Sequence, residues 1–198
     1  MPDKMPWDYH LDLSEDRLLF IAKLIMDIRH DTLELHDEES GDSPWSFGCR
    51  VYDRTRMILV KESTHIEWLT VPDPSLKCIF QIGSVPVRFY RGDADEPTKR
   101  TMARSYTELQ QCAIAFEGDD KNLLWRFAVE ADSSGEVTSI TFVGLSESEE
   151  VKCHWSAPIF EPVATVTDIA SFSGDGVDIG PPVVAPPNVD EDSEIGST

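Results

Sequence analysis

The sequence has no long apolar segment, no Lys or Arg after Lys152 and none of the common catalytic signatures. Its apolar runs are far shorter than the roughly 20 residues that a membrane-spanning helix needs, and the first residues lack the basic-then-apolar order of an export signal. Glycine-rich phosphate loops, the Gly-x-Ser-x-Gly elbow and the His-Glu-x-x-His zinc motif are missing. We therefore expect a cytoplasmic protein outside the membrane, and the sequence argues against an enzyme.

Negative charge dominates the chain. Its 198 residues carry 37 acidic and 17 basic side chains, for a formal net charge of -20. Eight acids and no base follow Phe160, which leaves -12 on residues 1–160 and -8 on residues 161–198. Such a field repels nucleic acids and anionic lipids and attracts basic proteins. The composition thus argues against nucleic-acid and membrane partners and favours a basic protein partner, although negative charge also serves solubility alone.

Residues that could hold a metal are few and scattered. The four cysteines stand at positions 49, 78, 112 and 153, with no Cys-x-x-Cys pair, which predicts reduced thiols in the core. His30-Asp31 and His36-Asp37 form a repeated pair, but a separation of six residues places the two imidazoles on different faces of a helix. His65-Ile66-Glu67 lacks the second half of a zinc deaminase signature. We predict no metal, no cofactor and no catalytic residues.

The first predicted element is an amphipathic helix over residues 14–36, extending at least to His30. Apolar side chains recur there at intervals of three and four residues, at Leu18, Ile21, Ala22, Ile25 and Ile28. This spacing is typical of one helix face, and acids stand in the first turn.

The pattern from Trp45 onward predicts strands. Alternating side chains and short turn signals favour an antiparallel meander of four or five strands. We expect these strands over residues 45–52, 56–62, 65–71, 77–82 and 85–90. Pro86 cannot donate a ladder hydrogen bond, so it favours a sheet edge or the start of a strand.

A second helix is predicted over residues 97–116, where apolar residues recur every three or four positions. Two further runs, residues 123–132 and 136–145, flank Ser133-Ser134-Gly135 and predict a β-hairpin. A last strand is expected over residues 150–158. The fold class is thus α+β, with helices on one face of an antiparallel sheet.

The chain divides at about residue 160. Residues 1–160 are predicted to form a single α+β domain. Residues 161–198 combine proline, glycine and acids without any base, a composition that buries too little apolar surface to offset the entropy of ordering. We predict a disordered acidic tail there.

The segment 88–104 is the basic exception in this acidic chain. Its candidate ligand-binding residues are Arg88, Tyr90, Arg91, Lys99, Arg100 and Arg104. Arginines near a helix N-terminus can bind a carboxylate or a phosphate. Asp93, Asp95 and Glu96 lie between them, and our favoured interpretation is that these acids cap the helix and pair with the arginines.

Two hypotheses about function follow from the sequence. The first is a non-enzymatic protein-interaction module, such as an adaptor, an inhibitor, an immunity-like or a chaperone-like protein, whose acidic surface binds a basic partner. The alternative is a domain that binds or transforms a small anionic ligand through Arg88, Arg91 and Arg100. They differ in whether these arginines are paired internally or open to a ligand.

Overall fold

The computed structural model describes residues 4–99, 103, 123–146 and 150–159. The helices are α1 (Pro6–Tyr9), α2 (Glu15–Glu34) and α3 (Pro44–Glu62), and the strands are β1 (Leu69–Asp73), β2 (Ile79–Ile82), β3 (Val85–Arg91), β4 (Leu124–Ala131), β5 (Val137–Leu145) and β6 (Val151–Ser156). The fold class is therefore α+β. The predicted tail and most of the predicted helix over residues 97–116 lie outside the described residues, so the division at residue 160 stays a prediction.

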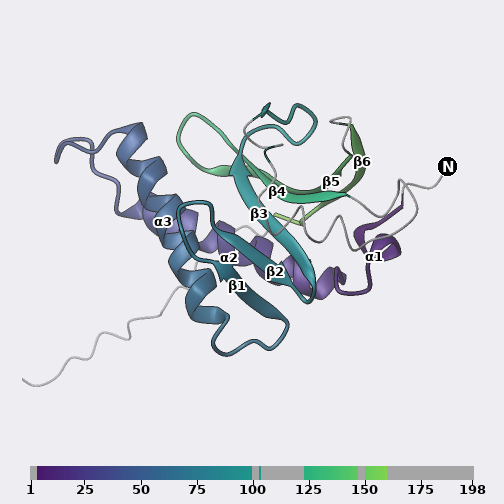
Figure 1. The fold of residues 1–198 in the computed structure, drawn as a ribbon. Coiled ribbons are helices and arrows are strands. Elements are labelled where there is room, and N and C mark those ends of the chain that lie inside the picture. The colour runs from purple at the N-terminus through teal and green to yellow at the C-terminus, as the bar shows by residue number, and fades with distance from the viewer. Residues whose placement is uncertain (1–3, 100–102, 104–122, 147–149, 160–198) are drawn as a thin grey trace, which may run out of the picture. The chain divides into compact units, whose positions relative to one another are not determined.

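The six strands form one mixed sheet in the order β1-β2-β3-β4-β5-β6 (Figure 1). Every neighbouring pair is antiparallel except β3 and β4, which run parallel. The prediction of a wholly antiparallel sheet is thus wrong at this pair. The sequential order of the strands does not decide whether a neighbouring pair runs parallel or antiparallel. A parallel pair needs a long crossover, and the chain between β3 and β4 is long enough to supply one.

Helix α2 confirms the predicted amphipathic helix. Leu18, Ile21, Ala22 and Ile25 are buried on one face, and that face packs against the sheet and α3 in the main core. The helix ends at Glu34, two residues before the predicted limit.

The prediction of two strands over residues 45–52 and 56–62 is wrong, because helix α3 occupies this segment. Its buried residues Phe47, Val51, Thr55 and Leu59 recur every four positions, a period that overlaps with strand alternation over a short run. A start signal was present: Ser43 caps the helix through a 3.2 Å bond from the Ser46 amide to its hydroxyl, and Pro44 follows. The predicted meander therefore keeps only β1, β2 and β3.

The remaining strands agree with the sequence pattern within a few residues. Strand β1 begins at Leu69 rather than residue 65, because the chain still turns there. Pro86 is the second residue of β3, as its missing N–H group favours. The predicted hairpin is formed by β4 and β5, and β6 pairs beside it.

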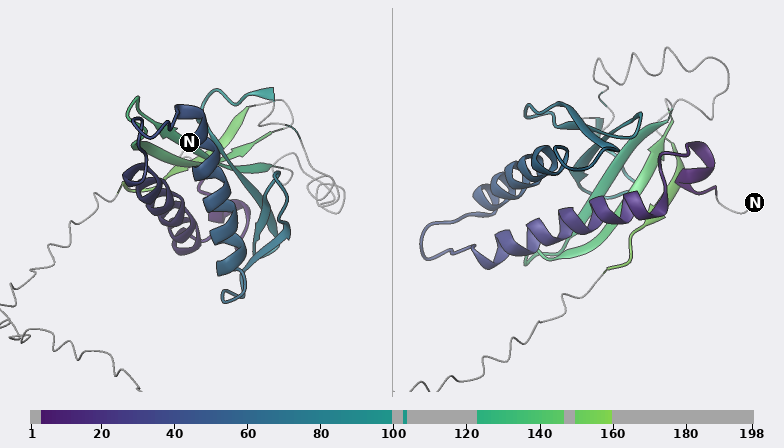
Figure 2. Two further views of the ribbon diagram at one scale, coloured as in Figure 1. Left: turned by 90° about the vertical axis from the view of Figure 1, so that its left-hand side faces the viewer. Right: turned by 90° about the horizontal axis from the view of Figure 1, so that it is seen from below.

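Helices α2 and α3 lie side by side on one face of the sheet (Figure 2). Between them and the strands lies the main core, whose centre is aromatic. The rings of Phe127 and Phe142 are 4.6 Å apart, and Trp125 stacks on Phe142 at 5.2 Å. Full burial of one such side chain contributes roughly 1.5–3 kcal/mol. A smaller cluster on the opposite face contains Ala94, Leu124, Ala128, Val143 and Leu145.

The turn between β2 and β3 is attached to the start of α2 by one carboxylate. Asp12 accepts hydrogen bonds from the Ser84 amide at 2.9 Å and the Ser84 hydroxyl at 3.0 Å, and its other oxygen pairs with Arg17 at 3.1 Å. Gly83 makes this approach possible, since a Cβ atom there would lie 2.1 Å from the Asp12 carboxyl carbon. Gly83 also has a φ of 60°, which favours glycine.

Two glycine substitutions test this attachment. Gly83→Ala and Gly41→Ala both place a side chain at positive φ, but Gly41 has nothing within 4 Å of a new Cβ. We expect Gly41→Ala to lower the free energy of unfolding by about 1 kcal/mol through backbone strain alone. Gly83→Ala should cost roughly 1–3 kcal/mol more, because Asp12 must move. Urea unfolding of both variants measures the difference, and equal losses would contradict the close approach.

The same carboxylate predicts a dependence of stability on pH. The Ser84 amide, and then the Ser84 hydroxyl and Arg17, lower the pKa of Asp12 below its ordinary value of 3.8. Because the pKa of Asp12 is lower in the folded state, the ionised carboxylate stabilises the fold at pH values above the ordinary pKa. This contribution is lost as the pH falls through the folded-state pKa. Asp12→Asn should therefore cost about 1 kcal/mol at pH 7 and progressively less below pH 4. Unfolding curves from pH 7 to pH 3 test this, and a difference independent of pH would contradict it.

Candidate functional site

The second half of strand β3 has one open edge. Strand β2 pairs with β3 only as far as Val87, whereas β4 pairs with it through Arg91. The Gly92 amide donates to Val129 O at 3.1 Å, and backbone groups alternate sides along a strand. The N–H and C=O groups of Phe89 and Arg91 therefore point away from β4. No described residue forms a backbone hydrogen bond with them.

A pocket of about 390 Å³ lies at this edge, within the size range of ligand sites. It is lined by residues 88–91 of β3, by Tyr52 of α3 and Leu76 of the β1–β2 turn, and by Thr98 and Arg126. Side chains from both faces of the sheet line it because it surrounds the strand edge. Phe89 packs with the main core, whereas Tyr90 packs with the cluster on the opposite face.

Aromatic side chains form the wall of the pocket on the helix side. The rings of Tyr52 and Phe89 are 5.1 Å apart, and the Tyr52 hydroxyl donates to Leu76 O at 2.6 Å. These contacts hold the β1–β2 turn beside α3. The Leu76 side chain is 77% exposed at the rim, so the pocket has an apolar border as well as charged groups.

The structure does not pair the two arginines of β3 with Asp93, Asp95 or Glu96, the described acids that follow them. Arg88 donates to two carbonyls, Lys77 O at 3.2 Å and Ala103 O at 3.1 Å. Arg91 is exposed, and neither arginine forms an ion pair within the described part of the chain. Asp93 instead accepts a 2.7 Å bond from the Asp95 amide. The described contacts therefore do not show the expected pairing of these acids with the arginines.

A third guanidinium lies behind Arg91. Arg29 of α2 is only 4% exposed, donates to Gly135 O at 2.6 Å and lies 5.1 Å above the Phe47 ring. Its Nη2 atom has no hydrogen-bond partner among the described residues. Burial, and next the charge of Arg91, lower the pKa of Arg29, while Glu136 and Asp132 act in the opposite direction. Arg29 thus lies close enough to Arg91, and also to the acids Glu136 and Asp132, for their charges to act on it.

Tyr90 acts as a neutral hydrogen-bond donor. Its hydroxyl donates to Asp93 O at 2.9 Å, which attaches the segment after β3 to the sheet. Burial, and then the nearby Asp93 carboxylate, raise the pKa of Tyr90 to about 12. The phenol thus stays protonated near neutral pH and adds no negative charge beside the arginines.

The structure brings together three of the six predicted site residues. Arg88, Tyr90 and Arg91 line the pocket, whereas Lys99 is exposed and lies outside its lining. Arg100 and Arg104 lie outside the described residues. Two pocket residues, Tyr52 and Arg126, were not predicted from the sequence; Tyr52 lies in a segment that was predicted to be a strand. The signal for Arg126 was a single charge inside the apolar run "LLWRFAV". Arg126 is 1% exposed and pairs in register with Arg88.

Other candidate residues do not converge on a site. No group of three or more potential metal ligands occurs among the described residues. Cys78 and Cys153 are buried as expected, and burial raises the pKa of Cys78 to about 11. Cys49 is exposed on α3, so its expected place in the core is wrong. Cys112 lies outside the described residues.

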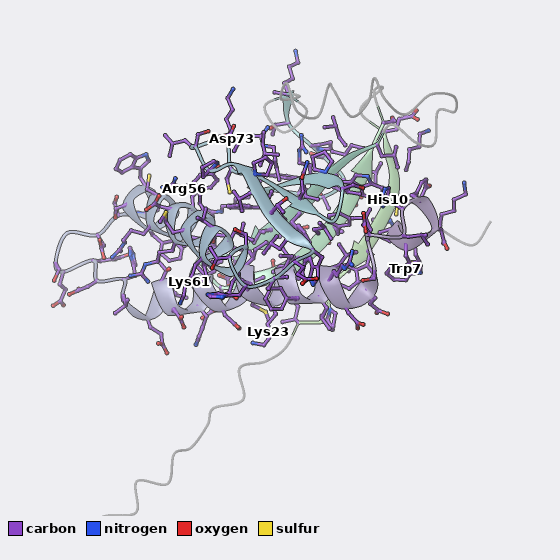
Figure 3. The ribbon with its side chains drawn as sticks, turned by 60° about the horizontal axis from the view of Figure 1, so that its bottom comes forward. Trp7, His10, Lys23, Arg56, Lys61 and Asp73 are labelled. Carbon is purple, nitrogen blue, oxygen red and sulfur yellow. The ribbon has the colours of Figure 1, made fainter. Side chains whose placement is uncertain are left out.

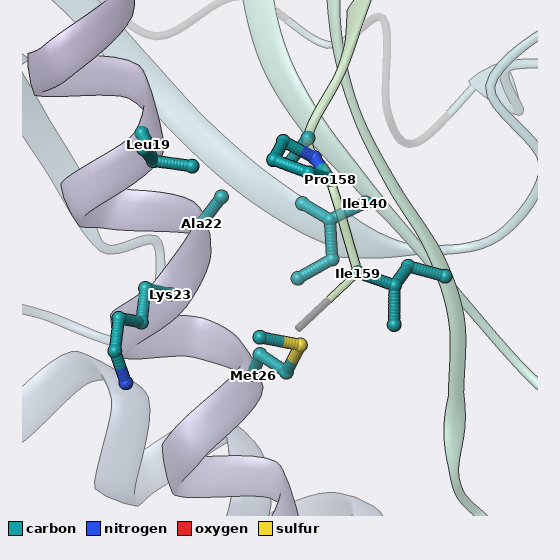
Figure 4. A pocket seen from close by; sticks show the side chains of 8 residues that line it. Leu19, Ala22, Lys23, Met26, Ile140, Pro158 and Ile159 are labelled. Atoms are coloured by element: carbon teal, nitrogen blue, oxygen red, sulfur yellow. The ribbon is translucent and has the colours of Figure 1, made fainter. Parts of the chain in front are cut away.

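A second hollow lies between α2 and the end of β6 (Figure 4). Its volume is about 10 Å³, which is close to the space of one water molecule. Leu19, Ala22, Met26, Ile140 and Ile159 are among the residues that line it. It is a seam in apolar packing, too small for a ligand.

None of the helices in the described ranges has the length and apolar character needed to cross a membrane. Comparisons of the chain with protein-family models, with curated proteins and with solved structures find no match in any of the three.

Proposed function

We propose that this protein is a non-enzymatic binding module that captures an anionic group in the pocket at the edge of β3. The observation that supports this function is the pair Arg88 and Arg91, which line one pocket without an ion-paired acid among the described residues. Guanidinium groups bind carboxylates and phosphates through two parallel hydrogen bonds.

The surroundings of the arginines indicate what else the ligand carries. Tyr52, Phe89 and Leu76 offer apolar surface next to the charges, so a ligand with an apolar body attached to its anionic group would contact both. Arg56, on the same helix as Tyr52, differs because Asp53 pairs with it at 2.5 Å. Unlike Arg56, the arginines of β3 form no ion pair with a described acid.

The net charge of -20 supports a second proposal. In it the acidic surface binds a basic protein, as an adaptor, inhibitor, immunity-like or chaperone-like protein would. Long-range attraction between opposite charges favours such an encounter. The two proposals are compatible, because one uses the pocket and the other uses the surface around it.

Binding of small anions to the full chain tests the pocket. Pyrophosphate and glutarate should bind in isothermal titration calorimetry, and Arg91→Ala should weaken binding about tenfold or more, since a hydrogen bond to a charged group contributes about 1.5–3 kcal/mol. Lys23→Ala is the matched control. Lys23 lies on α2 (Figure 3) and pairs with Asp27 at 2.6 Å, so this variant removes one positive charge away from the pocket.

Two results would refute the proposed pocket. One is the absence of binding for both anions, and the other is an equal loss of affinity in Arg91→Ala and Lys23→Ala. Circular dichroism of both variants checks that the fold is retained, which we expect because both side chains are exposed.

A further inference from the structure

We propose that the ligand of this pocket is an extended acidic peptide segment of a partner protein, which adds to the sheet as a strand beside Phe89 and Arg91. This inference rests on the proposed function, because the same arginines recognise the ligand. It goes further by naming the class of ligand and assigning a role to the open backbone edge.

The backbone of β3 provides the first argument. The N–H and C=O groups of Phe89 and Arg91 point away from β4, to the side on which the pairing of β2 with β3 ends at Val87. A peptide in extended conformation can bond with all of these groups, as strands do when they join an exposed sheet edge. A small anion would bind the arginines and leave these backbone groups unused.

The side chains provide the second argument. Successive side chains of an added strand point to opposite faces of the sheet. On the helix face they meet Phe89 and Arg91, and on the other face they meet Arg88 and Tyr90. Each face thus offers one aromatic ring and one guanidinium. A strand with an acid opposite each arginine and an apolar residue opposite each ring matches both faces.

Helix α3 extends the apolar surface beyond the pocket. Trp45 stands seven residues before Tyr52, two helical turns away and on the same helix face, and it is 78% exposed. Between them, a Cβ added at Gly48 would meet nothing within 4 Å. This face of α3 can therefore contact apolar side chains of a peptide that continues past Arg91.

Charge complementarity selects a peptide over a second copy of this chain. Two copies joined through their β3 edges would bring Arg88 and Arg91 of one against the same residues of the other, and like charges opposite one another destabilise strand pairing. An acidic segment replaces this repulsion with two ion pairs.

A designed peptide tests the inference on the full chain. The probe is a blocked seven-residue peptide with the core Glu-Val-Val-Glu, which places the same side chains against residues 88–91 in either strand direction. We expect it to bind more tightly than glutarate, and at least about tenfold more tightly than its Lys-Val-Val-Lys counterpart. Hydrogen exchange measured by NMR should slow at the Phe89 and Arg91 amides upon binding.

Methylation of the peptide amides separates strand addition from ion pairing. Only alternate amides of an added strand face β3. Methylation of one alternate pair in the core should weaken binding about tenfold or more, since two hydrogen bonds are lost, whereas methylation of the other pair should change it less than about threefold. Both methylated peptides keep the two carboxylates, so each is a control for the other.

The outcomes distinguish this inference from the proposed function. Binding of glutarate and pyrophosphate without tighter binding of the peptide would overturn strand addition and leave the anion pocket intact. Equal effects of the two methylations, or no slowing of exchange at Phe89 and Arg91, would also overturn it. A dimer in sedimentation analysis with these amides protected in the absence of peptide would assign the edge to a second copy and overturn it. Failure of all probes to bind would refute both proposals.

Discussion

The parallel pairing of β3 with β4 is the contact on which the rest of this sheet depends. It joins the antiparallel strands β1 to β3 to the antiparallel strands β4 to β6. Because β4 occupies one edge of β3 as far as Arg91, and β2 occupies the other only to Val87, this pairing also determines which backbone groups stay open. Its register sets Arg88 beside Arg126, two arginines far apart in the chain.

Much of the fold was predictable from local patterns. Helix α2 and the strands β2 to β6 have a clear period or a strong turn between them, so each segment indicates its own structure. Helix α3 was not predicted, because Phe47 and Val51 fit both a strand and a helix over a short run, and only the cap at Ser43 separates the two. Burial against α2 then favours the helix, which is a tertiary effect that the local sequence does not contain.

The candidate site was predictable only in part for the same reason. Arg88, Tyr90 and Arg91 stood out as neighbours in the sequence, whereas Tyr52 and Arg126 reach the pocket through tertiary packing and strand register. The pairing of β3 with β4, and hence the open edge, depends on contacts between distant segments. No local pattern shows where β2 stops pairing.

The arginines of the pocket are positively charged, whereas the net charge of the whole chain is negative. The net charge of -20 repels an anionic ligand at a distance, while Arg88 and Arg91 attract it at contact. Because the long-range field does not attract anions, a ligand must gain its binding free energy from contacts within the pocket. This favours ligands that make many such contacts at once. The arginines therefore contribute to selectivity more than to the speed of association.

The open edge of β3 also bears on the colloidal stability of the protein. An unpaired strand edge is a template for association between copies, and charged side chains along it prevent this. The chain has a pI of about 4.4, so mild acid removes the general repulsion between molecules and leaves Arg88 and Arg91 as the local barrier. The arginines at positions 88 and 91 thus have two roles: they recognise a ligand and they prevent edge-to-edge association of the folded protein. An aliphatic residue at position 88 or 91 would fulfil neither role.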